Sequence, residues 1–303
     1  MQHQINTMLL LLDDNDEAVR LEMADQILRM GYDVLPQLQE ALFEFDFEHT
    51  ESLYALQDIT QKLEFNFYAD KLLAWSHNPN DLLEGVWLLN KTFPNAPDID
   101  DINKEIERIK IEVWLDLRYD LTALEKVRIL NHVFFNRFSF TGDNDDFFNP
   151  NNNLLHKVLR HKKGNPILLS VIYAIVAQRL YIPIFGVNLP QNFVLAYLDI
   201  PSLPKPTADS RGKSMEPPPN HDVLFYVNPY SQGTVFGRKH IESFVKNLNM
   251  TTHPEFFYPC SNKDIVMRIL NNLILSYQKV NKMELAQSYW LLLKRLDEEP
   301  LEG

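Results

Sequence analysis

The sequence predicts an α+β fold that is mostly helical, and three observations support this. Apolar residues recur at helical spacing over most of residues 5–137. A strongly apolar helix, Pro166–Leu180, has no polar face and therefore belongs in a core. Three segments with β-type alternation follow it, at Ile184–Asn188, Phe193–Leu198 and Val223–Val227. A buried helix followed by strands indicates a helix packed on a small antiparallel sheet.

The length of 303 residues is typical of about two domains, and 45% apolar residues are enough to form a real core. No apolar run approaches the ~18 residues that cross a bilayer. The start, Met1–Gln4, lacks the basic region of a secretory signal. Cys260 is the single cysteine, which excludes internal disulfides and multi-cysteine zinc sites. We expect a cytoplasmic protein.

The formal net charge of −12 is concentrated in residues 1–120, which hold 9 Lys and Arg against 25 Asp and Glu. Such a surface repels phosphate groups, so we expect neither nucleic acid nor a membrane as a partner, although a basic protein could face it. The basic cluster His156–Lys163 is interpreted as a solvated helix end before Gly164, with a phosphate-binding patch as the alternative.

The first domain is expected over residues 1–97 and is helical. Asp13–Asp16 offers N-caps for a helix that Gly31 ends, and a second apolar series follows Pro36, which resembles a HEAT-type helix pair. Further helices are predicted at 51–63, 65–76 and 80–91, before a break at Phe93–Pro97.

The second domain is expected over residues 98–258, beginning with helices at 98–120, 122–137 and 153–163. Its Pro-rich loop at 200–220 is interpreted as a disordered insertion, with a functional lid as the alternative. Residues 259–303 are expected to form a hairpin of two helices, Asp264–Tyr277 and Glu284–Asp297, that resembles a tetratricopeptide-type unit.

Three separated segments, in this order and at workable spacing, resemble the transglutaminase-like family of bacterial SirB-type proteins. They are 150–173, which contains Lys163-Gly164-Asn165-Pro166; 186–193, Gly186-Val187-Asn188-Leu189-Pro190-Gln191-Asn192-Phe193; and 227–233, Val227-Asn228-Pro229-Tyr230-Ser231-Gln232-Gly233. The resemblance implies a papain-like core between an N-terminal helical region and C-terminal tetratricopeptide-like helices.

In the wider superfamily, a Cys at the start of the buried helix is the nucleophile, a His on one strand is the base, and an Asp or Asn on the next strand orients that His. By the resemblance, these positions fall at Pro166, Asn192 and Asn228. Proline has no side-chain proton to lose, and an amide cannot act as a general base near neutral pH. We therefore expect no enzymatic activity and a degenerate triad.

Relocated catalytic groups are the alternative. Ser170 lies one turn after Pro166 on the same helix, and Cys260 lies in the later segment Tyr258–Ser261. Either could act with His221 if the Pro-rich loop folded back, which would make the chain a hydrolase or acyl-transferase. The competing interpretation is a core serine, a half-buried thiol and a histidine at a loop end.

No cofactor and no metal are expected. His156 and His161 are five residues apart, whereas a spacing of four places two imidazoles on one helix face for zinc. The acidic loop Thr141–Asp146 lacks the EF-hand pattern for calcium. A Gly-rich phosphate loop is also missing from a chain with only 9 glycines.

The sequence thus predicts a non-catalytic, transglutaminase-like module that binds a protein or peptide or has a regulatory role. A cleft beside the degenerate triad is expected to be lined by Tyr173, Asn192, Phe193 and Tyr230, which can hold an amide without reacting with it. A scaffold that works through its acidic N-terminal helices is a further alternative.

Overall fold

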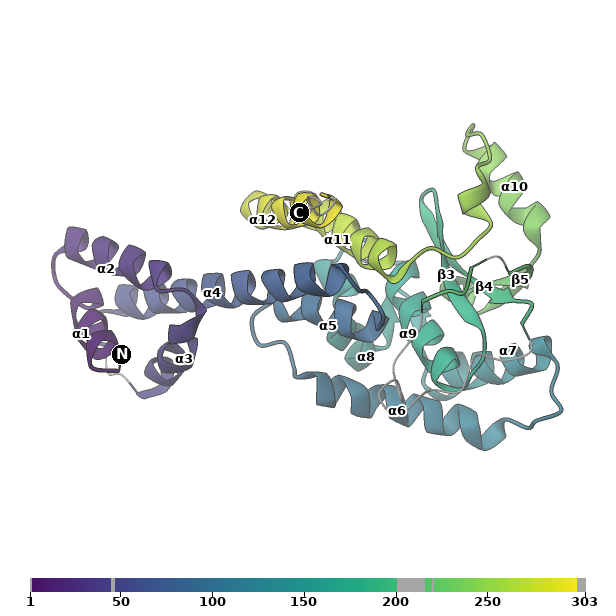
Figure 1. Cartoon of the computed structure of the whole chain (residues 1–303), viewed down its shortest axis with the longest axis horizontal. Coiled ribbons are helices and arrows are strands. Elements are labelled where there is room, and N and C mark those ends of the chain that lie inside the picture. Colours follow the sequence, from purple (N-terminus) through teal and green to yellow (C-terminus); the bar gives the residue numbers. More distant parts are fainter. Residues whose placement is uncertain (1, 45–46, 201–215, 220, 299–303) are drawn as a thin grey trace. The chain divides into compact units, whose positions relative to one another are not determined.

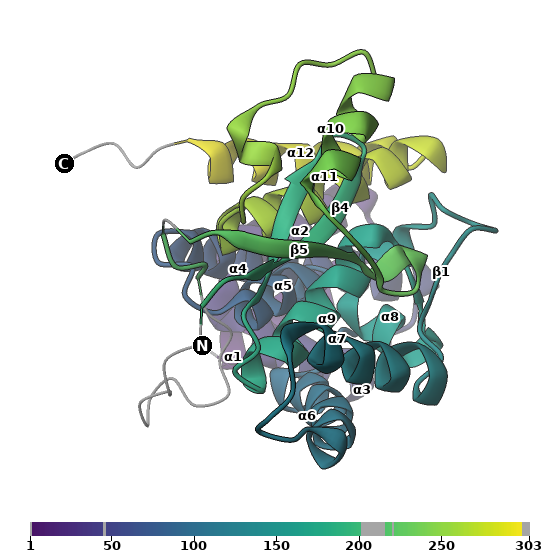
Figure 2. The same cartoon turned by 90° about the vertical axis from the view of Figure 1, so that its right-hand side faces the viewer.

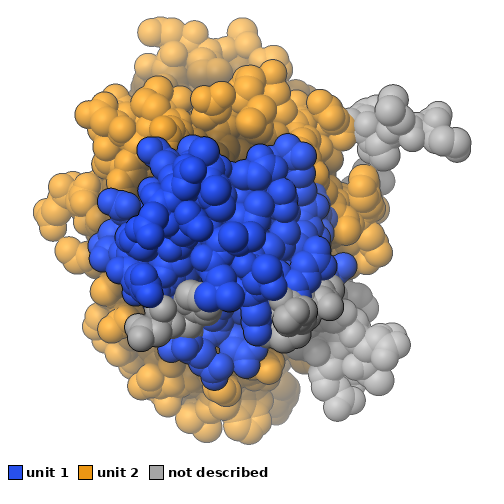
Figure 3. All heavy atoms as spheres, turned by 90° about the vertical axis from the view of Figure 1, so that its left-hand side faces the viewer, with its two compact units in different colours: residues 1–72, 91–96 blue, residues 73–90, 97–303 orange. Residues whose placement is uncertain are grey.

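The structure, a computed structural model, describes residues 2–44, 47–200, 216–219 and 221–298 (Figure 1). The predicted Pro-rich loop at 200–220 lies mostly outside the described residues. The chain divides into two compact units (Figure 3): unit 1 comprises residues 1–72 and 91–96, and unit 2 comprises residues 73–90 and 97–303. The three-domain division made from the sequence stays a prediction. Among the described helices, none combines the length and the apolar character that crossing a membrane requires.

Unit 1 is helical. It contains α1 (Gln2–Leu12), α2 (Glu17–Arg29), η1 (Tyr32–Val34), α3 (Leu35–Glu44) and most of α4 (Thr50–Ser76). The Asp16 carboxylate caps α2 by accepting a hydrogen bond from the Ala18 N–H at 2.9 Å, and Gly31 adopts a φ of 75° just after the helix. The predicted N-cap region and the predicted stop are therefore confirmed.

The core of unit 1 is aliphatic. It is formed by Ile5, Leu9 and Leu12 of α1, Ile27 of α2, Leu35 and Leu38 of α3, and Leu56, Ile59 and Leu63 of α4, with neighbours. Helix α4 is continuous where the sequence predicts two helices, at 51–63 and 65–76. That prediction is wrong because residues 63–66 contain neither glycine nor proline to end the helix.

Helices precede the sheet in unit 2. They are α5 (Leu82–Lys91, of which Lys91 is counted in unit 1), α6 (Ile99–Asp116), α7 (Ala123–Asn131), the π-helical segment η2 (His132–Arg137), η3 (Pro150–Asn153), α8 (Leu155–His161) and α9 (Pro166–Arg179). Thr122 begins α7 with a capping box, in which its side chain and that of Glu125 bond to each other's backbone N–H. The predicted helix at 122–137 is therefore α7 with a π-helical end.

Helix α9 is buried over almost its whole length, as its composition predicts. The sheet beside it has the antiparallel order β3 (Ile184–Leu189), β4 (Asn192–Leu198), β5 (Val223–Asn228) and β6 (Thr234–Phe236). In two perpendicular views the sheet lies between α9 and α10 (Arg238–Asn247) (Figures 1 and 2). Ile241 and Val245 of α10 pack on the sheet face that carries Val187 and Val194.

Unit 2 ends in η6 (Pro254–Phe256) and the hairpin of α11 (Asn262–Lys279) and α12 (Met283–Asp297), whose two helices are both predicted. Two short strands, β1 (Thr141–Gly142) and β2 (Lys163–Gly164), form a separate parallel pair. The fold is α+β and mostly helical, and β1, β2, β6 and α10 are among the elements that the sequence analysis misses.

Candidate functional site

The start of α9 is held by a chain of amide hydrogen bonds. The Asn165 side chain caps the helix by accepting a hydrogen bond from the Leu168 N–H at 2.8 Å, and its Nδ2 donates to Asn153 Oδ1 at 2.7 Å. Asn153 in turn donates to Ser276 Oγ at 3.1 Å. Pro166 occupies the first helical position and is buried. The position that the resemblance assigns to a nucleophile therefore carries a ring without an ionisable proton.

Asn192 and Asn228 lie at the same end of the β4–β5 pair, and we call them the paired asparagines although these two described residues do not contact each other through a hydrogen bond. The antiparallel register joins Leu195 to Val227, so moving toward Asn192 on β4 corresponds to moving toward Asn228 on β5. Alternation along the strands places both asparagines on the face that carries Val194 and packs toward α10. Both side chains are partly exposed.

A series of contacts that includes β1 and Tyr230 connects the start of α9 with Asn228. Gly164 pairs with Gly142, and a Cβ on Gly142 would lie 2.5 Å from Cε2 of Tyr230. The Asn228 side chain accepts hydrogen bonds from the N–H groups of Tyr230, at 3.1 Å, and of Ser231. Within the described residues, no hydrogen bond joins the side chains of Asn192 and Asn228.

A second group of hydrogen bonds lies beside this site, and the sequence pattern does not predict it. Asn131, the last residue of α7, donates from Nδ2 to the Gly233 carbonyl at 2.9 Å and accepts from the Tyr173 hydroxyl at 2.9 Å. Tyr173 is fully buried, and burial raises its pKa well above the ordinary value. It therefore stays neutral and supports the wall of the site as a hydrogen-bond donor.

Of the four residues expected to line the cleft, the structure leaves two accessible. Tyr173 is 0% exposed and Phe193 is 1% exposed, so in this structure both belong to the core and present no surface to a ligand. Asn192 and Tyr230 are partly exposed. The Tyr230 hydroxyl donates to Asn144 Oδ1 at 2.8 Å. The rings of Tyr230 and Phe147 are arranged edge to face, with their centroids 6.3 Å apart.

The structure does not bring the relocated catalytic groups together. Ser170 is 0% exposed, and its Oγ has no hydrogen-bond partner within the described residues. Cys260 donates to the Gly186 carbonyl at 3.4 Å, and burial raises the pKa of this thiol to about 12. The His221 ring instead lies 2.8 Å from the Pro219 carbonyl. A buried hydroxyl and an un-ionised thiol are poor nucleophiles.

The basic cluster lies where a helix end is predicted. Helix α8 ends at His161, and Lys162 follows it with a φ of 60° and its ammonium 4.8 Å from the Phe140 ring centroid. His156 lies within α8, where burial and then the charge of Lys157 lower its pKa to about 4. Across the described part of the chain, no group of three or more His, Cys, Asp or Glu side chains could hold a metal ion.

Comparisons with known proteins found one family and several relatives of this chain. The model of the transglutaminase-like superfamily matches residues 100–271. A UPF0162 protein of Xylella fastidiosa is 25% identical over 167 residues, covering 53% of this chain and 52% of that protein. UPF0162 protein YchA of Escherichia coli is 22% identical over 240 residues, covering 76% of this chain and 80% of that protein.

Human F-box only protein 21 is 25% identical over 169 residues, covering 55% of this chain and 24% of that protein. The chain spans about half the length of the Xylella fastidiosa relatives, and no solved structure matches it significantly. The superfamily model covers more than half of the chain and includes the α9 start, the sheet and the paired asparagines. This chain belongs to the transglutaminase-like superfamily.

Proposed function

We propose that this protein is a non-catalytic member of its superfamily, located in the cytoplasm, which binds a protein or peptide segment at the end of the β4–β5 pair. The observation that carries the proposal is Pro166, buried at the first position of α9. A thiolate mechanism needs a sulfur at that place and a base beside it. A proline ring and an asparagine amide supply neither.

The same positions retain groups that recognise a peptide backbone. Asn192 uses its Oδ1 to accept a hydrogen bond from the Phe193 N–H at 2.8 Å, while its Nδ2 makes no hydrogen bond with the described residues. A free amide N–H can donate to a peptide carbonyl. Binding without turnover is the chemistry that these side chains support.

An apolar surface adjoins the amides. Phe147 and Phe148 are 42% and 45% exposed, and Phe147 contacts the ring of Tyr230. Exposed aromatic side chains beside partly exposed polar ones are typical of peptide-binding surfaces. This patch supports a segment with apolar side chains as the ligand.

Closer placement within the superfamily is part of the proposal. The quoted segments of residues 150–233 and the bacterial relatives support a SirB-type protein, and α11 with α12 supports a tetratricopeptide-like C-terminal hairpin. Neither assignment changes the chemistry proposed for Pro166 and Asn192.

Site-specific photocrosslinking tests the binding role. Benzoylphenylalanine at Phe147 or at Tyr230 is expected to crosslink the same protein in native cells, and Asn192→Ala is expected to weaken that crosslink. The matched control places the photoreactive residue at Leu285, which is 43% exposed on α12. An identical set of products from Phe147 and Leu285 would contradict a binding surface at the paired asparagines.

A further inference from the structure

A second surface of unit 2 lies where the C-terminal half of α6 approaches the end of α9. The buried face of α6 carries Ile102, Ile106 and Ile109, which are at most 4% exposed. Trp114, by contrast, is 62% exposed and Ile111 is 50% exposed. A helix that already buries one apolar stripe has no internal need for a second one, so this stripe is available to a partner.

The loop residues beside α6 extend the surface. Tyr119 is fully exposed and Tyr181 is 43% exposed. Tyr181 has a φ of 61°, a left-handed conformation that is uncommon for a residue other than glycine. Its N–H donates to the Gln178 carbonyl at 2.9 Å, which fixes the turn after α9 and keeps the ring outside the core.

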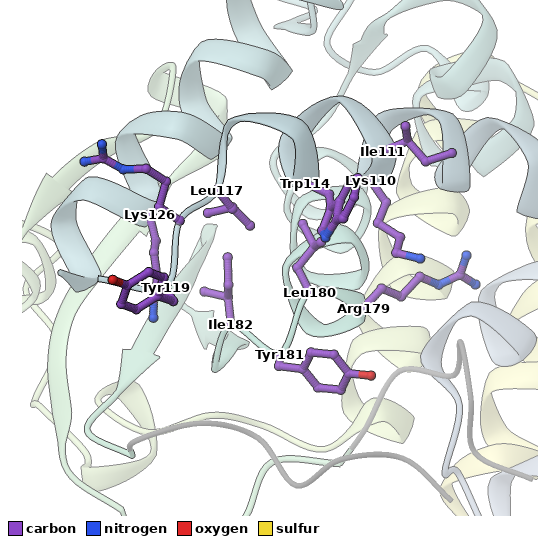
Figure 4. A pocket seen from close by; sticks show the side chains of 11 residues that line it. Lys110, Ile111, Trp114, Leu117, Tyr119, Lys126, Arg179, Leu180, Tyr181 and Ile182 are labelled. Atoms are coloured by element: carbon purple, nitrogen blue, oxygen red, sulfur yellow. The ribbon is translucent and has the colours of Figure 1, made fainter. Parts of the chain in front are cut away.

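These side chains surround a pocket of about 630 Å³. Figure 4 shows its arrangement: Lys126 and Tyr119 lie at one end, Lys110 and Arg179 lie at the other, and aliphatic side chains including Leu117, Ile182 and Leu180 lie between them. The pocket is therefore apolar in its middle and cationic at both ends.

The cations are only partly neutralised. The Glu107 carboxylate accepts hydrogen bonds from both Arg179 and Lys110, each at 2.9 Å, and Asp81 adds a second negative charge near Arg179. The Arg179 side chain is 4% exposed, and its Nε has no hydrogen-bond partner within the described residues. Burial lowers the pKa of Arg179 although Glu107 and Asp81 raise it, as expected for a buried cation with incomplete compensation.

Arg118, which also lines the pocket, forms an exposed ion pair with Asp120 at 3.5 Å, and such a contact contributes little in water. Lys126 has no ion-pair partner within 4 Å among the described residues. All charged residues lining this pocket are basic, on a chain whose net charge is −12. The local charge is therefore opposite to that of the whole protein.

We propose that this pocket docks a short segment of a partner protein in which acidic residues flank apolar ones. The apolar centre would cover Trp114 and the aliphatic side chains, and the flanking carboxylates would meet Lys126 at one end and Lys110 at the other. This surface is separate from the paired asparagines, so the proposal does not rest on the function proposed for that site.

Fluorine NMR of the full chain labelled with 5-fluorotryptophan tests the proposal, since the protein has four tryptophans and Trp114→Phe assigns the signal. The probe is the peptide acetyl-Glu-Leu-Phe-Leu-Glu-amide, and its uncharged and basic counterparts replace both glutamates with glutamine or lysine. The Trp114 signal is expected to shift and saturate with the acidic peptide, with at least tenfold weaker affinity for the other two.

Variants separate this pocket from the rest of the molecule. Lys126→Glu is expected to weaken binding of the acidic peptide at least fivefold. The control Lys239→Glu, at an exposed residue of α10, is expected to leave the affinity unchanged. Asn192→Ala also leaves the Trp114 shift unchanged, which distinguishes this pocket from the paired asparagines. Equal affinity for the three peptides, or no saturation at millimolar acidic peptide, would overturn the proposal. A Trp114 shift that depends on protein concentration alone would identify a second copy as the occupant and would also overturn it.

Discussion

Asn131 and Gly233, 102 residues apart in the chain, pack so closely that a Cβ at residue 233 would force the Asn131 side chain to move. Asn131 donates to the Gly233 carbonyl at 2.9 Å, and a Cβ on Gly233 would lie 2.0 Å from Asn131 Oδ1. Gly233 also has a φ of 70°. The contact anchors the turn after β5 to α7, next to the paired asparagines.

The first prediction is that Gly233→Ala lowers the free energy of unfolding by at least about 2 kcal/mol, because the left-handed backbone disfavours alanine and the Asn131 hydrogen bond must shift. Urea denaturation followed by circular dichroism measures the loss. The control is Gly237→Ala, where a Cβ meets nothing within 4 Å. A loss of less than about 1 kcal/mol is expected there, because a weaker N-cap is offset by lower unfolded-state entropy. Equal losses of unfolding free energy in the two variants would contradict a close contact between Asn131 and Gly233.

The second prediction concerns Gly142 and Tyr230. A Cβ on Gly142 would lie 2.5 Å from the Tyr230 ring, so Gly142→Ala is expected to displace the ring and destabilise the protein by about 1–3 kcal/mol. In a Tyr230→Ala background the same substitution is expected to have little effect, because no ring remains to be displaced. A double-mutant cycle of unfolding free energies measures this coupling, and independent, additive effects would rule out the close approach.

The third prediction is a pH dependence of stability from His156. Its pKa is lowered from 6.5 to about 4, first by burial and then by Lys157. The unfolded chain therefore binds a proton that the folded chain refuses between these values, and stability falls as the pH decreases from about 6.5 to about 4. For a side chain that is only half-buried, the loss is on the order of 1 kcal/mol after screening by solvent.

His156→Gln is expected to remove that part of the pH dependence, while His161→Gln, on the exposed end of α8, is expected to keep it. Denaturation at several pH values compares the three proteins, and a histidine NMR titration reports the pKa of His156 directly. A His156 that titrates near 6.5 in the folded protein would refute this origin of the acid sensitivity.

The sequence predicts the central elements well where composition alone decides. Helix α9 is apolar on all sides and is buried, and the three longer strands follow it within one residue of their predicted bounds. Of the missed elements, β6 has a weak signal because it has only three residues at the sheet edge. Helix α10 carries a helical pattern, with Ile241 and Val245 four residues apart, that the sequence analysis did not use. The sequence does not distinguish the π-helical segment η2 from an α-helix, because the hydrogen bonds of a π-helix span only one residue more than those of an α-helix.

The site is predictable only in part, for a physical reason. The resemblance gives the positions of Pro166, Asn192 and Asn228, but contacts such as Asn131 with Gly233 depend on how distant segments pack. Tyr173 is expected to line the cleft, but its hydroxyl donates to Asn131 inside the core, a contact that depends on how α7 packs beside α9.

The fourth prediction places a thiol and an imidazole at the positions that the resemblance assigns to the triad. Asn192→His alone is expected to give no amidase or transglutaminase activity, because a nucleophile is still absent there. Pro166→Cys combined with Asn192→His is expected to give a thiol with the same pKa as in Pro166→Cys alone, because Asn192 lies on the sheet face that packs toward α10, whereas Pro166 begins α9 on the other side of the sheet (Figures 1 and 2). Thiolate absorbance measured against pH compares the two proteins, and a lower pKa in the double variant would show that the two positions face each other.

Covalent labelling of the folded wild-type protein tests the proposed non-catalytic function most directly. Intact-mass analysis after treatment with a fluorophosphonate or with iodoacetamide is expected to show no adduct near neutral pH, because Ser170 is buried and the Cys260 thiol has a pKa of about 12. In guanidinium, iodoacetamide is expected to add one group at Cys260, which shows that the reagent works. Stoichiometric labelling of the folded protein that is lost in Ser170→Ala or in Cys260→Ala would contradict the non-catalytic account.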